Sequence, residues 1–418
     1  MMEVYEEKLS LFERAPVDTC IDKTEWIPFA PVGQIGKNAP LEFDIPGNSA
    51  AYVDLERTRL RVGLRIINGE GKPVKKEDKV CLANLGLQSL FRQVDIELNQ
   101  RLVTATVGSY YSYKAYLDVI LNCNEQDTKG VLKNEMFHKD SYDAMDSDSV
   151  NNIGFDRRYK ETMNGETVFL EGPIRMDICQ QNRMILNGIR IRIKLYQQED
   201  PFRLMAETQG VYKVEIMDAA LRVCQVKLNP VLVVEHEKAI AQKPALYPFW
   251  KSDLKAFNIE KGSYSWSADD VYHGNIPSEI RLVLCSASAF SGHYTENPFN
   301  FKNYGLNFAE VMVDGVSVPA QAITPNYEKG DFKEAYWMLM ADYPKYGHCI
   351  EMKEYPSGYC VYIFRIFGKV GGEVVAQKKG GHTRINLKFS KALKESATAL
   401  LYASFPEEIK VDSARNVL

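Results

Sequence analysis

Apolar and polar residues alternate with a period of two over much of this chain. From Ile189 to Leu195 every second residue is isoleucine or leucine, and the residues between them are arginine or lysine. This period predicts a half-buried antiparallel strand, because successive side chains of a strand point to opposite faces. Similar runs, separated by Gly, Pro, Asn and Asp, predict strands at Leu60–Ile67, Glu215–Leu228, Glu279–Ser286, Tyr359–Phe367 and Ala399–Phe405.

Helical spacing is confined to a few stretches. Ser112–Asn122 and Asp331–Tyr343 combine this spacing with good helix-forming residues. Asp331 is a predicted N-cap, and Glu334 three residues later is its capping-box partner. Pro230–Gln242 is predicted as a strand that runs into a helical turn.

Two stretches, Val94–Val103 and Val311–Val318, have the outline of a tight hairpin. The second bends at Asp-Gly, which tolerates the positive φ of a type I′ turn. The bend at Asn99 is matched 215 positions later by Asp314. This spacing is the first sign that the chain repeats itself.

Further landmarks recur in the same order. The strand at Leu60 is matched 220 positions later at Ile280, and the helical Ala115 is matched 220 positions later at Ala335. A fourth correspondence sets 174–178 and the strand 189–195 against 384–389 and 399–405, with offsets near 210. Four landmarks in register favour tandem duplication of a unit of roughly 200 residues.

The predicted fold is all-β, with two tandem eight-stranded antiparallel jelly rolls and short inserted helices. Sandwiches of this kind limit exposed strand edges. The predicted division is an N-terminal arm at 1–37, a first jelly roll at 38–212 and a second at 213–418, with the junction near Gln198–Gly210. Long loops are expected at Asn122–Glu166 and Gly368–His382. The duplication predicts the same strand connectivity in both halves and separate cores on either side of residue 210.

Composition argues against several classes of protein. The chain has 418 residues, of which 45% are hydrophobic and 25% charged, and a net charge of −4. These values are typical of globular domains and give no sign of specific nucleic-acid binding. The eight cysteines include no CxxC pair, so buried free thiols and a reducing compartment are predicted. No apolar run is long enough to span a membrane, and no signal peptide is evident.

The sequence predicts no catalytic, cofactor-binding or metal-binding residues. The histidines form no HxH pair, and His236-Glu237 lacks the second histidine of HExxH. Gly69–Lys72 resembles a phosphate loop only superficially, and the acidic stretch at Asp146 lacks the glycine and glutamate of a calcium loop. Carboxylate pairs of the glycosidase type stay open, because they are assembled only in three dimensions.

The aromatic stretch NPFNFKNYGLNF, Asn297–Phe308, can be interpreted in two ways. Its rings could stack on nucleic-acid bases. The favoured interpretation is that they pack between sheets or at a subunit contact, where Tyr and Phe are enriched.

These residues also resemble a family. The stretches Lys227–Ile240, Ala245–Gly262, Ile276–Gly292 and Asn297–Pro319 are similar to the major capsid proteins of polinton (Maverick) elements, with relatives in adintovirus-like and adomavirus-like elements. The resemblance covers most of the chain and is densest from about 215 to 345. NPFNFKNYGLNF followed by the Val-Asp-Gly hairpin is its most specific part.

The resemblance implies a non-enzymatic double jelly-roll protein that forms homotrimers. Such trimers are pseudo-hexameric capsomers that tile an icosahedral shell beside neighbouring capsomers and a single jelly-roll penton protein. The implied location is the virion, with synthesis in the host cytoplasm and assembly there or in the nucleus. Two alternatives stay open: a carbohydrate-binding or host-attachment β-sandwich, which a glycan array would detect, and a hydrolase, which needs facing carboxylates in a cleft.

Overall fold

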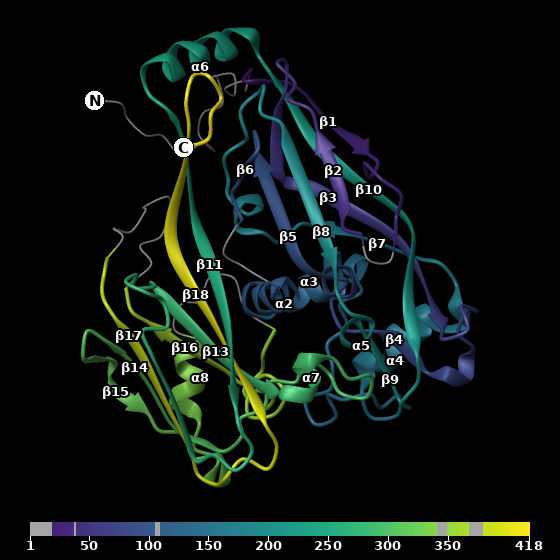
Figure 1. The fold of residues 1–418 in the computed structure, drawn as a ribbon, viewed down its shortest axis with the longest axis vertical. Coiled ribbons are helices and arrows are strands. Elements are labelled where there is room, and N and C mark those ends of the chain that lie inside the picture. The colour runs from purple at the N-terminus through teal and green to yellow at the C-terminus, as the bar shows by residue number, and fades with distance from the viewer. Residues whose placement is uncertain (1–18, 37–38, 105–108, 341–348, 368–378) are drawn as a thin grey trace, which may run out of the picture.

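The computed structural model describes residues 19–36, 39–104, 109–340, 349–367 and 379–418. Most of the strands belong to two sandwiches, called unit 1 and unit 2 here. In Figure 1 unit 1 occupies the upper right and unit 2 the lower left, with helix α6 (Pro230–Gln242) at the top.

Unit 1 consists of two four-stranded antiparallel sheets. In spatial order, the first sheet contains β1 (Ile21–Phe29), β10 (Tyr212–Leu228), β3 (Tyr52–Asn68) and β7 (Val168–Pro173). The second contains β2 (Leu41–Ile45), β8 (Ile191–Gln197), β5 (Phe91–Leu98) and β6 (Arg101–Leu102). β4 (Val80–Leu82) and β9 (Leu204–Ala206) pair separately.

Unit 2 repeats this arrangement. Its first sheet contains β11 (Ala245–Ile259), β18 (Ala397–Val411), β13 (Glu279–Ser286) and β16 (Val361–Arg365). Its second sheet contains β12 (Ser265–Asp269), β17 (Thr383–Phe389), β14 (Leu306–Val313) and β15 (Val316–Ile323).

Strand connectivity is the same in both units. When the eight sandwich strands of either unit are numbered along the chain, the first sheet has the order 1-8-3-6 and the second 2-7-4-5. This is the connectivity of an eight-stranded jelly roll. The all-β double jelly-roll fold with inserted helices is therefore confirmed, including the expected agreement between the halves.

The sheets do not follow the predicted domain limits. β1 lies inside the segment predicted as an N-terminal arm, and β10 lies almost wholly within the predicted second jelly roll, yet they pair with each other in unit 1. The sheets thus assign Ile21–Leu228 to unit 1 and Ala245–Val411 to unit 2. Residues 1–18 of the predicted arm lie outside the described residues.

The linker between the units is α6, rather than the predicted junction at 198–210. The Asn229 side chain accepts a hydrogen bond from the Val231 amide, and Pro230 occupies the first helical turn. Both features favour a helix start, so the segment is helical throughout and the predicted strand is wrong. The stretch 198–210 instead contains α5 (Asp200–Arg203) and β9.

Three of the four repeat landmarks are confirmed. The strands at Leu60 and Ile280 are the third strands of their units. Both hairpins join the fourth strand to the fifth through two residues of positive φ, with φ 44° at Asn99 and 48° at Asp314. α2 (Tyr111–Asn122) and α8 (Lys333–Met340) both connect the fifth strand to the sixth.

The fourth landmark is wrong by one strand. β8 is the seventh strand of unit 1 and corresponds to β17, whereas 399–405 lies in β18, the counterpart of β10. Residues 174–178 are not a strand and run into a 3₁₀ turn at Asp177–Cys179. Alternating apolar residues reveal a strand but not its place in a sheet, and this caused the error.

Helices are inserted mainly in the connections. α2 and α8 match the predicted helices, although α8 begins at Lys333 rather than at Asp331, and 341–343 lie outside the described residues. The predicted loop 122–166 contains α3 (Glu125–Lys129) and α4 (Ile153–Thr162). α1 (Gly86–Ser89) and α7 (Ala287–Ser291) complete the set of described α-helices. Within the predicted loop at 368–382, residues 368–378 lie outside the described part.

The two sandwich cores are joined rather than separate. One continuous cluster of buried apolar side chains includes residues of both units. Figure 1 shows why, because α2 of unit 1 lies in the middle of the molecule, between the sheets of unit 1 and strand β18 of unit 2. The expectation of separate cores on either side of residue 210 is therefore wrong, although the connectivity of the units is duplicated.

Candidate functional site at the junction between the units

Aromatic rings fill the apolar part of the junction. Phe299 of unit 2 stacks on Tyr116 of α2, with ring centroids 4.1 Å apart and an interplanar angle of 11°. Tyr113 meets Phe299 edge-on at 5.6 Å and stacks on Phe290 of unit 2 at 5.7 Å. The predicted packing role of the 297–308 stretch is confirmed for Phe299, which is fully buried.

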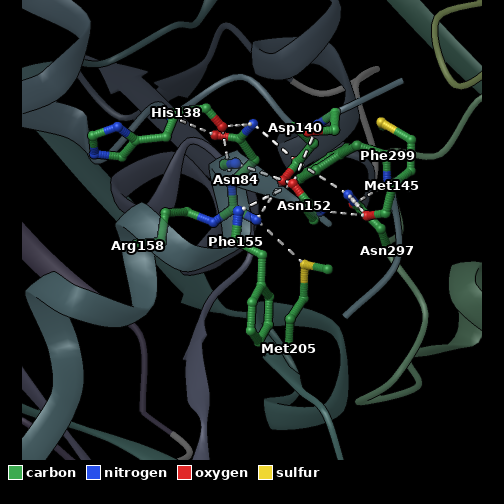
Figure 2. A network of polar contacts seen from close by, with 12 residues as sticks. Asn84, His138, Asp140, Met145, Asn152, Phe155, Arg158, Met205, Asn297 and Phe299 are labelled. Atoms are coloured by element: carbon green, nitrogen blue, oxygen red, sulfur yellow. Dashed lines mark hydrogen bonds and ion pairs between the residues drawn. The ribbon is translucent and has the colours of Figure 1, made fainter. Parts of the chain in front are cut away.

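A buried ion pair anchors a polar network beside these rings (Figure 2). Arg158 of α4 and Asp140 both have fully buried side chains, and Arg158 Nη2 lies 2.9 Å from Asp140 Oδ1. Arg158 also donates hydrogen bonds to the carbonyl oxygens of Leu82 and His138. Asn84 donates to Asp140 Oδ2 and to the same His138 carbonyl. A buried arginine is costly unless its donors are paired, and here they are shared among three oxygen acceptors and the Met205 sulfur.

Asn297 connects this network to unit 2. Its side-chain amide donates to Asp140 Oδ2 at 3.1 Å and to the Met145 carbonyl at 2.9 Å (Figure 2). Its backbone amide donates to Asp146 Oδ1 at 3.0 Å, and Tyr359 donates to the Asp140 carbonyl at 2.9 Å. Asp140 therefore receives hydrogen bonds from both units.

A second buried network crosses the junction at α2. Lys114 Nζ lies 2.7 Å from Asp118 Oδ2 and 3.0 Å from Asp177 Oδ1. Tyr402 of β18 donates to Asp118 Oδ1 at 3.1 Å, and Arg281 Nη1 of β13 lies 3.6 Å from the same oxygen. Asp118 thus faces cations of both units.

Serine and tyrosine hydroxyls complete the second network. Ser252 of β11 donates its amide and its hydroxyl to Asp177, at 2.7 and 2.8 Å. The Ser252 hydroxyl also lies 2.7 Å from the Tyr402 hydroxyl. The Arg281 guanidinium lies over the Tyr402 ring, 4.8 Å from its centroid. Both carboxylates of this network, Asp118 and Asp177 of unit 1, therefore accept hydrogen bonds from hydroxyl groups of unit 2.

The second network keeps its charges at neutral pH. Burial alone would raise the pKa of Asp118, but Lys114 and Arg281 outweigh it and lower that pKa below its ordinary value. Burial would lower the pKa of Lys114, yet Asp118 and Asp177 hold it well above its ordinary value. The pairing across the junction is thus ionic over the whole physiological range.

The residues of the second network cover one face of the first sheet of unit 2. Arg281 pairs with Tyr402 across β13 and β18, so both side chains point to the same side of the sheet. Neighbouring positions Ile280 and Leu282 point the other way, into the sandwich core. Unit 1 therefore seals the outer face of this sheet of unit 2.

The motifs inspected in the sequence serve local structure. His236 lies on α6, and its Nδ1 is 3.0 Å from the Tyr52 hydroxyl. Asp148 accepts hydrogen bonds from the amides of Val150 and Asn151 in a turn. Among the described residues, no group of three or more His, Cys, Asp or Glu side chains is arranged to hold a metal ion.

All eight cysteines are free thiols, and Cys20 is the exposed one. Burial raises the pKa of Cys81 to about 12 and that of Cys123 to about 11. These thiols are therefore protonated and unreactive at neutral pH. Separately, no helix of the described residues has the length and apolar character needed to cross a bilayer.

For the charged residues of the junction, one pattern in the sequence is informative, and the sequence predictions above do not include it. Lys114 and Asp118 stand four residues apart within an otherwise apolar helical run, SYKAYLDVIL. A lysine and an aspartate at this spacing on a buried helix indicate an internal ion pair. Arg158 lies in a polar stretch and carries no comparable signal.

Comparison with known proteins gives likenesses in sequence and in fold. No family model matches the chain. The "Uncharacterized protein F54H12.2" of Caenorhabditis elegans is 25% identical over 332 residues, which cover 77% of each protein.

Solved structures of viral proteins share the fold. A chain of the Sputnik virophage is similar over 100% of this protein and 92% of its own length, with a TM-score of 0.68 and 11% identity. The Faustovirus major capsid protein matches over 97% and 92%, with a TM-score of 0.59 and 9% identity. The mavirus major capsid protein matches over 99% and 93%, with a TM-score of 0.54 and 11% identity. Because these sequence identities are low, the likeness establishes the fold alone, which is the double jelly roll over the whole chain.

Proposed function

We propose that this protein is a structural major capsid protein, without enzymatic activity, of an icosahedral virus or of a virus-like transposable element of the polinton kind. The observation that carries the proposal is the duplicated jelly roll with its sealed internal junction. Support comes from the full-length likeness to the Faustovirus and mavirus major capsid proteins. The sequence resemblance to polinton capsid proteins supports the finer assignment.

The proposed assembly is a homotrimer. Three copies of a chain with two like units place six similar lobes around a threefold axis. Such a block fits a lattice position with six neighbours while keeping only true threefold symmetry. The proposed neighbours in the shell are further trimers and a single jelly-roll penton protein at the fivefold positions.

Rigidity within each chain suits this role. The buried charges of the two networks fix one relative orientation of the two units, because a rotated arrangement would take Asp140 and Asp118 away from their partners in unit 2. A shell subunit needs a fixed angle between its two units, because a deviation in that angle would be repeated in every copy and would disturb the lattice. The proposed location is the virion, after synthesis in the host cytoplasm.

Mass photometry of the purified protein at micromolar concentration tests the proposal. We expect a trimer, and negative-stain images of pseudo-hexagonal particles that pack into arrays. A stable monomer under these conditions would contradict the assignment. A hydrolase or a glycan-binding protein would instead show turnover or binding without ordered assembly.

A further inference from the structure

The two units leave one pair of matching surfaces unused. Inside the chain, the outer face of the first sheet of unit 2 is covered by α2 and its network. The corresponding face of unit 1, on β1, β10, β3 and β7, has no such cover from the described residues. In Figure 1 this sheet lies along the right-hand edge of the molecule, whereas α8, the counterpart of α2, lies at the lower left.

Corresponding strand positions show that the two faces are equivalent. Arg61 and Arg281 both lie in the third strand of their units, one residue after the matched Leu60 and Ile280. Arg281 is buried at 5% exposure and lies against Asp118 of unit 1. The Arg61 side chain is 33% exposed, and its partners among the described residues, Asp218 and Phe169, lie in its own sheet.

The open face of unit 1 carries large apolar side chains beside arginines. Phe169 is 54% exposed, and the Arg61 guanidinium lies over its ring, 4.6 Å from the centroid. Trp26 is 47% exposed, and the Arg57 guanidinium lies over it at 4.9 Å. The two ring–guanidinium pairs lie at the two edges of this sheet, Trp26 on β1 and Phe169 on β7. Exposed aromatic and arginine side chains are typical of the energetic centre of a protein interface. We name this face of the sheet the open sheet face.

The open sheet face also holds paired charges. Arg61 lies 3.6 Å from Asp218, and Arg222 lies 3.1 Å from Glu171. These ion pairs are solvated and contribute little to stability of the single chain. They keep the face soluble until it is covered, and they supply donors and acceptors to a partner.

On the opposite side of the molecule, α8 presents an unburied helix surface. Ala335 and Leu339 are buried, whereas Trp337 is 68% exposed. Glu334, in the first turn, is exposed as well. A tryptophan face attracts arginine guanidinium groups, and tryptophan is enriched at interface hot spots. α8 therefore presents an aromatic ring and a carboxylate, and both can bind the arginine side chains of the open sheet face.

We infer that the open sheet face of one copy binds the α8 side of unit 2 of a second copy, reproducing between chains the contact that α2 makes within the chain. The contact is heterologous, because two different surfaces meet, and repeated rotation closes it into a ring. The inference rests on the proposed trimer and identifies the surfaces that build it.

Two variants and one control test the inference. Arg61→Glu reverses the charge at the centre of the open sheet face, and Trp337→Ala removes the exposed ring of α8. Tyr264→Ala is the control, because Tyr264 is also an aromatic residue, 64% exposed, on neither surface. Far-UV circular dichroism and urea unfolding would verify that each variant folds as the wild type does.

Analytical ultracentrifugation gives the readout. We expect Arg61→Glu and Trp337→Ala each to weaken trimer formation at least tenfold and the control to leave it unchanged. A wild-type trimer that neither variant weakens would overturn the assignment of these surfaces but leave the proposed trimer standing. A wild-type monomer would overturn both.

Mixing the two variants tests whether the surfaces bind each other. The Arg61→Glu chain keeps an intact α8, and the Trp337→Ala chain keeps an intact open sheet face. At high concentration, the mixture should therefore form a heterodimer that neither variant forms alone and that cannot close into a ring. Loss of the trimer in both variants without this heterodimer would show that the two surfaces do not pair.

Discussion

Removing Asp118 should destabilise the whole protein more than its size suggests. Asp118 is 6% exposed and faces Lys114, Arg281 and the hydroxyl of Tyr402. Asp118→Ala leaves two buried cations with fewer anionic partners. Breaking a buried pair in this way typically costs about 3–5 kcal/mol. Because Lys114 retains Asp177 at 3.0 Å, we expect the free energy of unfolding to fall by about 3 kcal/mol, at the lower end of this range.

Urea unfolding followed by tryptophan fluorescence and circular dichroism measures this cost. The expected result is a lower midpoint with an unchanged slope, because the surface exposed on unfolding stays the same. Asp156→Ala is a matched control, since Asp156 pairs with Lys160 at 2.7 Å on the surface of α4. That exposed pair should contribute less than about 1 kcal/mol.

A double variant separates charge from packing. Lys114→Met with Asp118→Leu removes one buried cation together with one buried anion, whereas Asp118→Ala removes the anion alone; Asp177 then loses Lys114 but keeps its two hydrogen bonds from Ser252. The double variant should therefore be more stable than Asp118→Ala alone. Equal stability of Asp118→Ala and the Asp156→Ala control would refute the view that the buried charges hold the units together.

Further variants test other parts of the junction and the fold. Lowering the pH should weaken the protein, because the lowered pKa of Asp118 contributes stability that is present above its ordinary value of 3.8 and lost as the pH falls through the folded value; urea midpoints of Asp118→Asn should show less of this acid dependence. Phe299→Ala should cost about 3–5 kcal/mol in urea unfolding, because it removes a fully buried ring at the centre of the aromatic cluster. Gly315→Ala should cost about 1–2 kcal/mol by the same measurement, because φ is 82° there and nothing lies within 4 Å of the added methyl group.

Local patterns predicted the strands and their duplication well. The two-residue turns at Asn99 and Asp314 are encoded by residues that accept positive φ, so the hairpins and their register could be derived directly. Period-two alternation identified β13 at its observed limits, Glu279–Ser286. Such features depend only on neighbours along the chain.

Long-range pairing was the harder part. β1 has the sequence IDKTEWIPF, which lacks a clean alternation because the strand lies at the edge of its sheet. Its partner, β10, starts at Tyr212, almost 200 residues later. The predicted domain limits failed here because the first and last strands of a jelly roll are neighbours in space but are the most distant strands in sequence.

The junction was the least predictable feature, since its charged groups have meaning only in three dimensions. Lys114 faces Asp118 one helical turn away, Asp177 in another segment of unit 1, and the carbonyl oxygen of Arg175. A single sequence shows the lysine but not the acceptors that make its burial tolerable. The apolar cluster around Phe299 was easier, because a run of aromatic residues indicates packing wherever it lies.

Duplication followed by divergence explains the difference between the two sheet faces. When two copies of one module are joined head to tail, one contact between a helix and a sheet is buried, that of α2 with the first sheet of unit 2. The open sheet face of unit 1 and helix α8 of unit 2 are not used in this contact. The buried contact is specified by ions and hydroxyls such as those of Asp118 and Tyr402, while the open sheet face has kept exposed rings such as Phe169 beside solvated ion pairs. A permanent contact can carry buried charge because it forms once, during folding. A contact made after folding is better built from solvated ion pairs and apolar rings, since neither leaves an unpaired charge buried in the free chain.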